Sequence, residues 1–164
     1  DKGLMEFEGK PMIQYIIDTV KPFVNEIIII ANQKGYDVFG YPVYEDLIKN
    51  SGPLAGIYTG LKHSKKIKNI VLSCDVPFVN SDLLNLMVMN CQDLDVVIPE
   101  KEGRTHQLIG VYDQSCIVTF EDELKKENRK LKSAIEKMNF KTVDANFLPD
   151  KIFNNINSKN DIEA

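Results

Sequence analysis

The spacing of apolar residues along the chain changes back and forth between that of a helix and that of a strand. In residues 11–23 (PMIQYIIDTVKPF), apolar side chains recur every three or four positions, and Pro11 suits the first turn of a helix. Residues 26–32 (EIIIIAN) form a short β-branched run that is apolar on both faces, which is typical of a strand covered on both sides. Residues 68–75 (KNIVLSCD) repeat that pattern, so two buried strands are predicted.

The rest of the chain continues this alternation. Gly52–Pro53 opens a predicted helix through Leu61, and Ser81 is a candidate cap for a helix over residues 83–90. The other predicted elements are strands at Val43–Tyr44, 95–99, 108–113 and 141–143, and helices at 115–126, at 131–138 and at the end of the chain, where Asn157 or Ser158 is the candidate cap. This order predicts one three-layer α/β/α domain over residues 1–164, Rossmann-like, with a mostly parallel sheet. In such a domain, ligands bind beyond the carboxyl ends of the strands.

Composition narrows the class of protein. The 164 residues are 43% hydrophobic and 27% charged, which suits a soluble globular domain. The net charge is −4, so the chain lacks the basic excess that nucleic-acid binding needs. The apolar runs are far shorter than the roughly 20 residues that cross a membrane. Neither a nucleic-acid partner nor a membrane is therefore expected.

Cysteines and histidines limit the metal chemistry. Cys74, Cys91 and Cys116 are widely spaced without a CxxC pair, so neither a disulfide framework nor a zinc cluster is indicated, and a reducing cytoplasm fits best. The chain has only two histidines, which argues against a His-rich transition-metal site. A hard cation held by carboxylates and phosphate remains open, and Mg²⁺ is the expected one.

Asp75 is the strongest single candidate for chemistry. It ends the apolar run of residues 68–75, which places a carboxylate at the carboxyl edge of a predicted central strand, where ligands bind in this architecture. A carboxylate at this place suits Mg²⁺. The alternative is that Asp75 only caps the following turn; its position directly after a buried run favours a functional role.

A glycine-containing segment, residues 52–60 (GPLAGIYTG), precedes this strand. Gly52 and Gly56 permit a close approach of the backbone, and the exposed amides of a helix start favour anions. The chain has neither GxGxxG nor GxxxxGK[ST], so an ordinary turn into a helix is an equally good interpretation from the pattern alone. Asp46 lies six residues earlier and could accept hydrogen bonds from a base or ribose in the same crevice, although, taken alone, a solvated loop carboxylate is the better explanation.

Three further residues carry weaker signals. Lys2 lies beside Gly3, as in a phosphate-binding loop, although lysines near chain ends are commonly solvated. His106 is best explained as a surface or hydrogen-bonded structural histidine. Cys74 is expected to be an inert thiol, because strand alternation turns it away from the face of Asp75.

Taken together, these motifs resemble the MobA-type molybdenum cofactor guanylyltransferases, a family of nucleotidyltransferases related to GT-A sugar-nucleotide enzymes. The resemblance spans nearly the whole chain. Five stretches carry it: DKGLMEFEGKPM at 1–12, Asp46 with GPLAGI, LSCDVPFV at 72–79, RTHQLIGVY at 104–112 and FNNINSKNDI at 153–162.

The chain departs from the family pattern in three places. The family has a first strand and a glycine-rich LAGGxSxRMG-like loop immediately before DKG, and the domain is expected to lack both in the sequence given. Gln107 stands where the family commonly has proline, and NSKND replaces the usual NTPED. The last two changes concern the acceptor side rather than the chemistry.

The resemblance implies a reaction and roles for five residues. Lys2 would bind the nucleotide phosphates, Asp46 the guanosine, and Asp75 a Mg²⁺ ion that bridges the phosphates, while Asn155 and Asn157 would lie near the acceptor. The implied reaction is attack by the terminal phosphate of molybdopterin or Mo-molybdopterin on the α-phosphorus of GTP, with release of pyrophosphate. Molybdoenzyme-maturation proteins are the implied protein partners.

Two alternatives stay open. A relative could use another nucleotide or acceptor, as a cytidylyltransferase for the same pterin or a cobinamide-phosphate guanylyltransferase does. A protein of another class, a non-catalytic cofactor carrier, could keep the fold; retention of Lys2, Asp46 and Asp75 argues against it. Base selectivity is the property that separates the first alternative from the guanylyltransferase.

Overall fold

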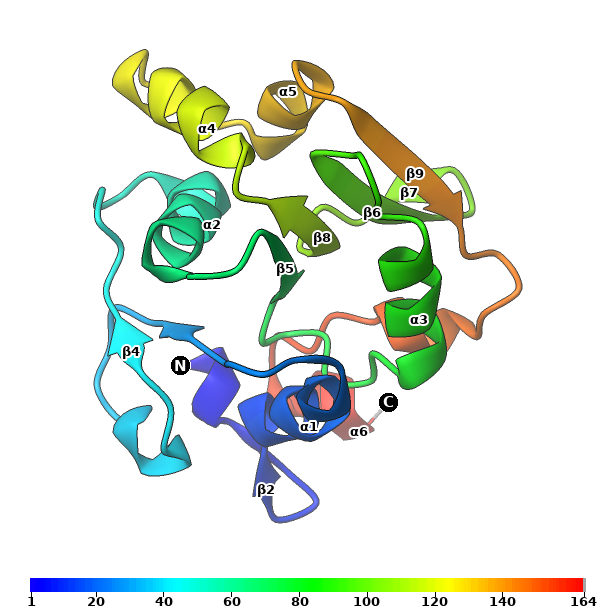
Figure 1. Ribbon diagram of the computed structural model, residues 1–164. Helices are drawn as coiled ribbons and strands as arrows, with labels where there is room; N and C mark the ends of the chain where they lie inside the picture. The colour runs from blue at the N-terminus through cyan, green and yellow to red at the C-terminus, as the bar shows by residue number, and fades with distance from the viewer. Residues whose placement is uncertain (164) are drawn as a thin grey trace.

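The computed structural model describes residues 1–163 and shows helices and strands that alternate along the chain (Figure 1). The helices are α1 (Met12–Val20), α2 (Gly52–His63), α3 (Ser81–Met89), α4 (Cys116–Lys125), α5 (Leu131–Glu136) and α6 (Lys159–Glu163). The strands are β1 (Glu6–Phe7), β2 (Lys10–Pro11), β3 (Ile29–Ile30), β4 (Val43–Tyr44), β5 (Lys68–Leu72), β6 (Val96–Lys101), β7 (Arg104–Thr105), β8 (Ile109–Asp113) and β9 (Phe140–Asp144). Short 3₁₀ helices occupy Lys2–Leu4, Lys21–Phe23, Asp37–Phe39 and Asp150–Phe153. Across the described residues, no helix is both long and apolar enough to cross a membrane.

The largest sheet holds five strands, and most of them point the same way. Its order is β5-β8-β6-β7, and β9 pairs with β6. β8 is antiparallel to both β5 and β6, so those two share a direction, which β9 shares as well because it pairs with β6 in parallel. The predicted α/β class is confirmed, with β8 and β7 as the reversed strands.

A tight hairpin explains the reversal. Lys101 of β6 pairs with Arg104 of β7, so the connecting loop has two residues, Glu102 and Gly103. Both have positive φ (52° and 77°), as in the mirror-image turns that suit the twist of two-residue hairpins. This hairpin and the β1–β2 hairpin were not predicted, because β1, β2 and β7 have only two residues each and show no alternating pattern.

The five-stranded sheet is covered on both faces. Val96 and Ile98 of β6 pack in one core with residues of α2, α4 and α5, whereas Val97 packs in a second core with residues of α3. Alternate residues of a strand point to opposite faces, so two cores on one strand mean a helix layer on each side. In Figure 1, α2 and α4 lie on one side of β5, β6 and β8, and α3 lies on the other.

The predicted two-sided burial of the strands at 26–32 and 68–75 is only partly correct. All five residues of β5 are partly exposed, and β3 is reduced to two residues. β3 pairs in parallel with β4 in a separate two-stranded sheet.

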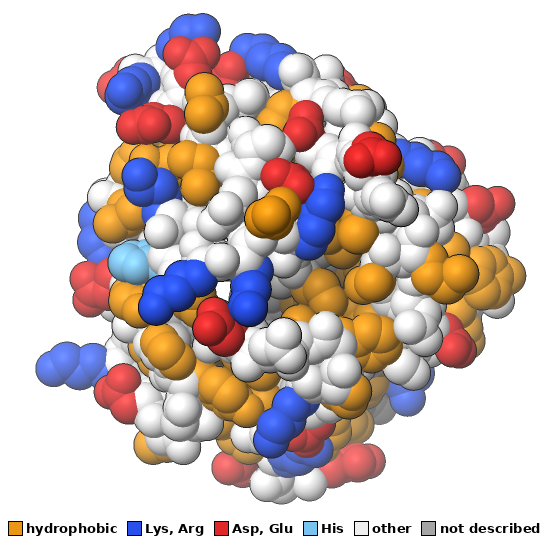
Figure 2. Space-filling model, in the orientation of Figure 1, with side chains coloured by type: hydrophobic (Ala, Val, Ile, Leu, Met, Phe, Trp, Pro, Cys, Tyr) orange, Lys and Arg blue, Asp and Glu red, His pale blue; other side chains and the backbone are white. Residues whose placement is uncertain are grey.

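A groove of about 760 Å³ lies against β3 and β5. Apolar side chains line it, among them Ile13, Ile17, Ile28, Ile57, Ile70 and Leu72, and Figure 2 shows hydrophobic side chains gathered near the middle of this face.

One predicted helix cap is wrong. The cap of α3 is Asn80, whose side chain accepts a hydrogen bond from the Leu83 backbone N–H (3.0 Å), and Ser81 is already helical. The Asn80 side chain has the better geometry for the unpaired amides at this helix start. At α6, Ser158 directly precedes Lys159, the first helical residue, so it occupies the predicted cap position. The carboxylate of Asp161 accepts hydrogen bonds from the backbone N–H groups of Asn157 and Ser158.

Candidate functional site

Asp75 lies just beyond the carboxyl end of β5, as predicted. The Ser73 hydroxyl donates a hydrogen bond to Asp75 Oδ1 (2.7 Å), and the Asp75 carbonyl accepts one from the Ile156 backbone N–H (2.7 Å). Asp75 is therefore held through both its side chain and its backbone. Burial, and next the charge of Asp75, raises the pKa of the neighbouring Cys74 thiol. A protonated thiol is a poor nucleophile, which agrees with the inert role expected for Cys74.

Lys2 lies in the first 3₁₀ turn, which its neighbours fix. Asp1 Oδ1 accepts hydrogen bonds from the Gly3 backbone N–H (3.1 Å) and from the Tyr36 hydroxyl. A Cβ at Gly3 would come within 2.6 Å of the Tyr36 hydroxyl oxygen, so this close approach needs a glycine. Lys2 Nζ donates a hydrogen bond to Asn157 Oδ1 (2.6 Å). The turn thus directs Lys2 toward the C-terminal segment.

Asp46 follows β4 and is paired with a residue that the sequence analysis did not single out. Asn32, which follows β3, donates from Nδ2 to Asp46 Oδ2 (3.0 Å), and its Oδ1 accepts from the Asp46 backbone N–H (2.9 Å). Since β3 and β4 are parallel neighbours, their carboxyl ends meet at one edge. A polar residue directly after the apolar run of residues 27–31 was the available signal for Asn32.

The start of α2 lies beside this pair. Asp46 Oδ1 is 3.7 Å from the point that a Cβ on Gly56 would occupy, which is ordinary contact. Thr59, fully buried on α2, accepts from the Leu47 backbone N–H (2.9 Å) and donates to the Ala55 carbonyl (2.8 Å). The loop after Asp46 is therefore tied to α2, which brings Asp46 and GPLAG together as the sequence suggested.

The site residues form two groups, and the carboxylate of each group contacts a residue that lines the groove. One group is Asn32 with Asp46; the other is Asp75 with Lys2, connected through residues 156–157. Within the described part of the chain, no hydrogen bond or ion pair joins the two groups directly. Gly56 of α2 and Ser73–Cys74 after β5 both line the groove, so the groove runs between them.

Asn155 and Asn157, the two asparagines expected near the acceptor, differ in their surroundings. Asn157 is bonded to Lys2, whereas the exposed Asn155 side chain forms no hydrogen bond with other described residues. Phe153 and Ile156 are buried and anchor the segment. The His106 ring contacts Phe153 (4.7 Å between centroids), and burial, with nearby Arg104, lowers the pKa of His106. His106 thus supports this segment, in agreement with the structural role expected for it.

The donor set limits how a metal could be held. Among residues 1–163, no cluster of three or more His, Cys, Asp or Glu side chains could hold a metal ion. Mg²⁺ is usually bound by one or two carboxylates together with substrate phosphates and water. One fixed carboxylate, Asp75, fits an ion that binds together with a nucleotide.

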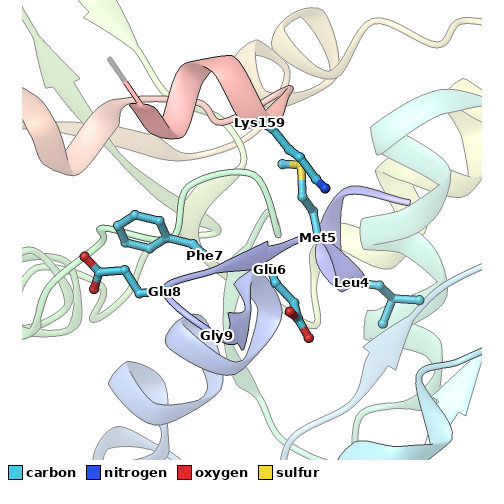
Figure 3. Close-up of a pocket in the computed structure, with 7 residues that line it drawn as sticks. All are labelled: Leu4, Met5, Glu6, Phe7, Glu8, Gly9 and Lys159. Carbon is cyan, nitrogen blue, oxygen red and sulfur yellow. The ribbon is translucent and has the colours of Figure 1, made fainter.

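A second, smaller hollow of about 590 Å³ lies beside the first turn of the chain. It is lined by Leu4–Gly9 and by Lys159 of α6 (Figure 3). In Figure 3, the Lys159 side chain extends alongside Met5. Phe7 of β1 packs edge-on against Phe78 (5.5 Å between centroids), close after Asp75 in the chain. The hollow lies where the two ends of the chain meet.

The comparisons with known proteins agree on one family. The family described as "MobA-like NTP transferase domain" matches residues 1–143. The chain is 31% identical to a probable molybdenum cofactor guanylyltransferase of Flavobacterium johnsoniae, over 99% of this chain and 86% of the relative. It is also 31% identical to the molybdenum cofactor guanylyltransferase of Yersinia pestis, over 99% of this chain and 85% of the relative.

Solved structures share the fold. Molybdopterin-guanine dinucleotide biosynthesis protein A from Archaeoglobus fulgidus superposes with a TM-score of 0.80 at 21% identity, over 99% of this chain and 87% of that one. 2-C-methyl-D-erythritol 4-phosphate cytidylyltransferase from Thermus thermophilus superposes with a TM-score of 0.79 at 12% identity, over 99% and 90% of the two chains. The family match over most of the chain confirms the resemblance found in the sequence, and this chain belongs to the MobA-like NTP transferase family.

Proposed function

We propose that this protein transfers GMP from GTP to the terminal phosphate of molybdopterin or Mo-molybdopterin and releases pyrophosphate. The observation that carries the proposal is that two carboxylates, Asp46 and Asp75, each contact a residue that lines one groove, Gly56 and Ser73 respectively, in a nucleotidyltransferase fold. Lys2 is connected to Asp75 through residues 156–157. The names of the relatives at 31% identity supply the acceptor. Molybdoenzyme-maturation proteins are the proposed recipients of the product.

The chemistry needs positioned charges rather than a protein nucleophile. An oxygen of the acceptor phosphate attacks the α-phosphorus of GTP; a new P–O bond forms while the bond to the pyrophosphate oxygen breaks and its electron pair leaves with pyrophosphate. Lys2 is proposed to place its ammonium beside the phosphates, where it stabilises the negative charge that develops on them. Asp75 is proposed to hold Mg²⁺, which when bound neutralises phosphate charge. Positioning of the two substrates accounts for the rest.

Asp46 is proposed to contact the guanosine. Asp46 Oδ2 accepts a hydrogen bond from Asn32, whereas Asp46 Oδ1 accepts none from the other described residues. A carboxylate oxygen in this position can accept hydrogen bonds from N–H or O–H groups of a base or ribose. Asn155 is proposed to contact the acceptor, because the family motif implies that role and its exposed side chain makes no hydrogen bond with other described residues.

Nucleotide selectivity tests the function. We expect calorimetry to show Mg²⁺-dependent binding of GTP in preference to CTP and ATP, and pyrophosphate release when molybdopterin is added. A preference for CTP would favour the cytidylyltransferase, and turnover with cobinamide phosphate but not molybdopterin would favour the corresponding guanylyltransferase. A chain that binds none of the three nucleotides would contradict the proposal and favour a cofactor carrier.

Replacement of Asp46 tests the guanosine contact. Asp46→Ala should weaken GTP binding about tenfold or more, because a hydrogen bond to a charged group contributes about 1.5–3 kcal/mol. Glu45→Ala is the matched control: Glu45 is the exposed neighbour, paired only with Lys49 in the described structure. Equal GTP dissociation constants for Asp46→Ala and wild type, measured by calorimetry, would show that Asp46 does not contact the guanosine.

A further inference from the structure

Lys2 and Asn157 are joined by a hydrogen bond although 155 residues separate them in the chain. Lys2 Nζ lies 2.6 Å from Asn157 Oδ1, and both residues are exposed. A lysine side chain loses rotamer entropy when its ammonium is fixed. A partner that holds the ammonium before a ligand arrives reduces the cost of binding. Asn157 therefore contacts the proposed phosphate-binding residue, Lys2, in addition to lying near the acceptor substrate as its motif implies.

The turn that carries Asn157 is itself held in place. The Asp161 Oδ2 atom accepts from the backbone N–H groups of Asn157 (2.8 Å) and Ser158 (2.9 Å), and from the Ser158 hydroxyl (3.3 Å). These bonds, the one from Asn157 first, lower the pKa of Asp161. Asp161 is thus a charged carboxylate at neutral pH, and charge-assisted hydrogen bonds are stronger than neutral ones.

The same turn is also hydrogen-bonded to Asp75, the second proposed nucleotide-binding residue of this group. Ile156 is buried, and its backbone N–H donates to the Asp75 carbonyl (2.7 Å). On the other side of the turn, Lys159 extends alongside Met5 (Figure 3). Consecutive residues therefore contact both Asp75 and the first turn of the chain.

We propose that residues 156–161, here called the C-terminal turn, form a clamp that positions Lys2 and Asp75 for the nucleotide, with Asn157 as the residue that positions the Lys2 ammonium. This inference rests on the proposed function, since it takes Lys2 and Asp75 as nucleotide-binding residues. It assigns Asn157 to the nucleotide side of the site and leaves Asn155, two residues earlier, as the acceptor-side asparagine. Asp161 is a positioning residue that acts through Asn157.

A double-mutant cycle tests the clamp. Asn157→Leu keeps the side-chain volume but removes the acceptor, and should weaken Mg-GTP binding about five- to tenfold. In a Lys2→Met background, the same change should alter binding by less than about twofold, because the interaction partner is already gone. Asp161→Asn should follow the same pattern with a smaller loss. Asn154→Leu, an identical change at an exposed position of the same segment, is the matched control.

A second readout needs no nucleotide. In ligand-free protein labelled at lysine nitrogens, the Lys2 ammonium signal, assigned by its loss in Lys2→Met, should shift and exchange faster with water in Asn157→Leu but not in Asn154→Leu. An unchanged Lys2 signal in Asn157→Leu would overturn the clamp. The clamp would also be overturned if the loss of Mg-GTP binding in the double variant equalled the product of the losses in Lys2→Met and Asn157→Leu. Absence of GTP binding by the wild-type chain would instead overturn the proposed function and the clamp together, so the two failures are distinguishable.

Discussion

Asp75→Asn is expected to abolish nucleotidyl transfer while the fold stays intact. The asparagine keeps the volume of the side chain and an oxygen that can accept from the Ser73 hydroxyl, which lies 2.7 Å from Asp75 Oδ1. The backbone bond from Ile156 is unaffected by the change. What disappears is the negative charge proposed to hold Mg²⁺ against the nucleotide phosphates, and loss of such transition-state stabilisation costs on the order of a thousandfold in rate.

The measurement is Mg²⁺-dependent pyrophosphate release with GTP and molybdopterin, together with the thermal midpoint of each variant. Asp75→Ala should be equally inactive, because it also lacks the charge. Asp82→Asn is the matched control, since Asp82 is an exposed aspartate in the first turn of α3. Pyrophosphate release by Asp75→Asn at near wild-type rate would show that Asp75 is not the metal-holding carboxylate.

Gly110→Ala is expected to have the largest effect on stability. Gly110 lies in β8, paired with Val71 of β5. A Cβ there would lie 2.8 Å from the Val97 carbonyl oxygen and 3.0 Å from Ile98 Cγ2. The first contact is with the backbone of a neighbouring strand, which cannot rotate away. Overpacking of this kind costs about 1–3 kcal/mol.

Thermal unfolding of Gly110→Ala should therefore begin at lower temperature, with a fall in Tm of about 2–4 °C for each kcal/mol lost. Gly60→Ala adds the same methyl group within α2, where the nearest atom, Ile30 Cγ1, is 3.8 Å away. It should be neutral or stabilising by up to about 1 kcal/mol, because alanine favours a helix interior over glycine. Equal Tm values for the two variants would contradict the close packing of β8 on β6.

Much of the candidate site could be predicted because its residues follow strands. Asp75 comes directly after an apolar run, and Asp46 follows the short strand Val43–Tyr44. In an α/β fold the carboxyl ends of such strands meet at one edge, so sequence position alone indicates a ligand site. The same reasoning extends to Asn32, which was overlooked because an amide after a strand is a weaker signal than a carboxylate.

The strand directions were harder to predict. Residues 95–99 and 108–113 both show a strand pattern, but that pattern carries no direction. The reversal depends on Glu102–Gly103, a two-residue turn with positive φ at both positions. A glycine in a charged loop is a common feature, so its role as the corner of a hairpin follows only from the pairing of Lys101 with Arg104.

The sequence by itself determined the class of fold, the family and the carboxylates at the strand ends, because these depend on periodicity and on motifs within a few residues of one another. Only the tertiary structure decided that β3 and β5 border a shared groove, that Asn32 holds Asp46, and that Asn157 reaches Lys2. Those contacts join residues 14 to 155 positions apart, so they exist only once the packing of several elements has set their distances. Local patterns specify each element, whereas the relation between two distant side chains depends on the packing of all the elements between them.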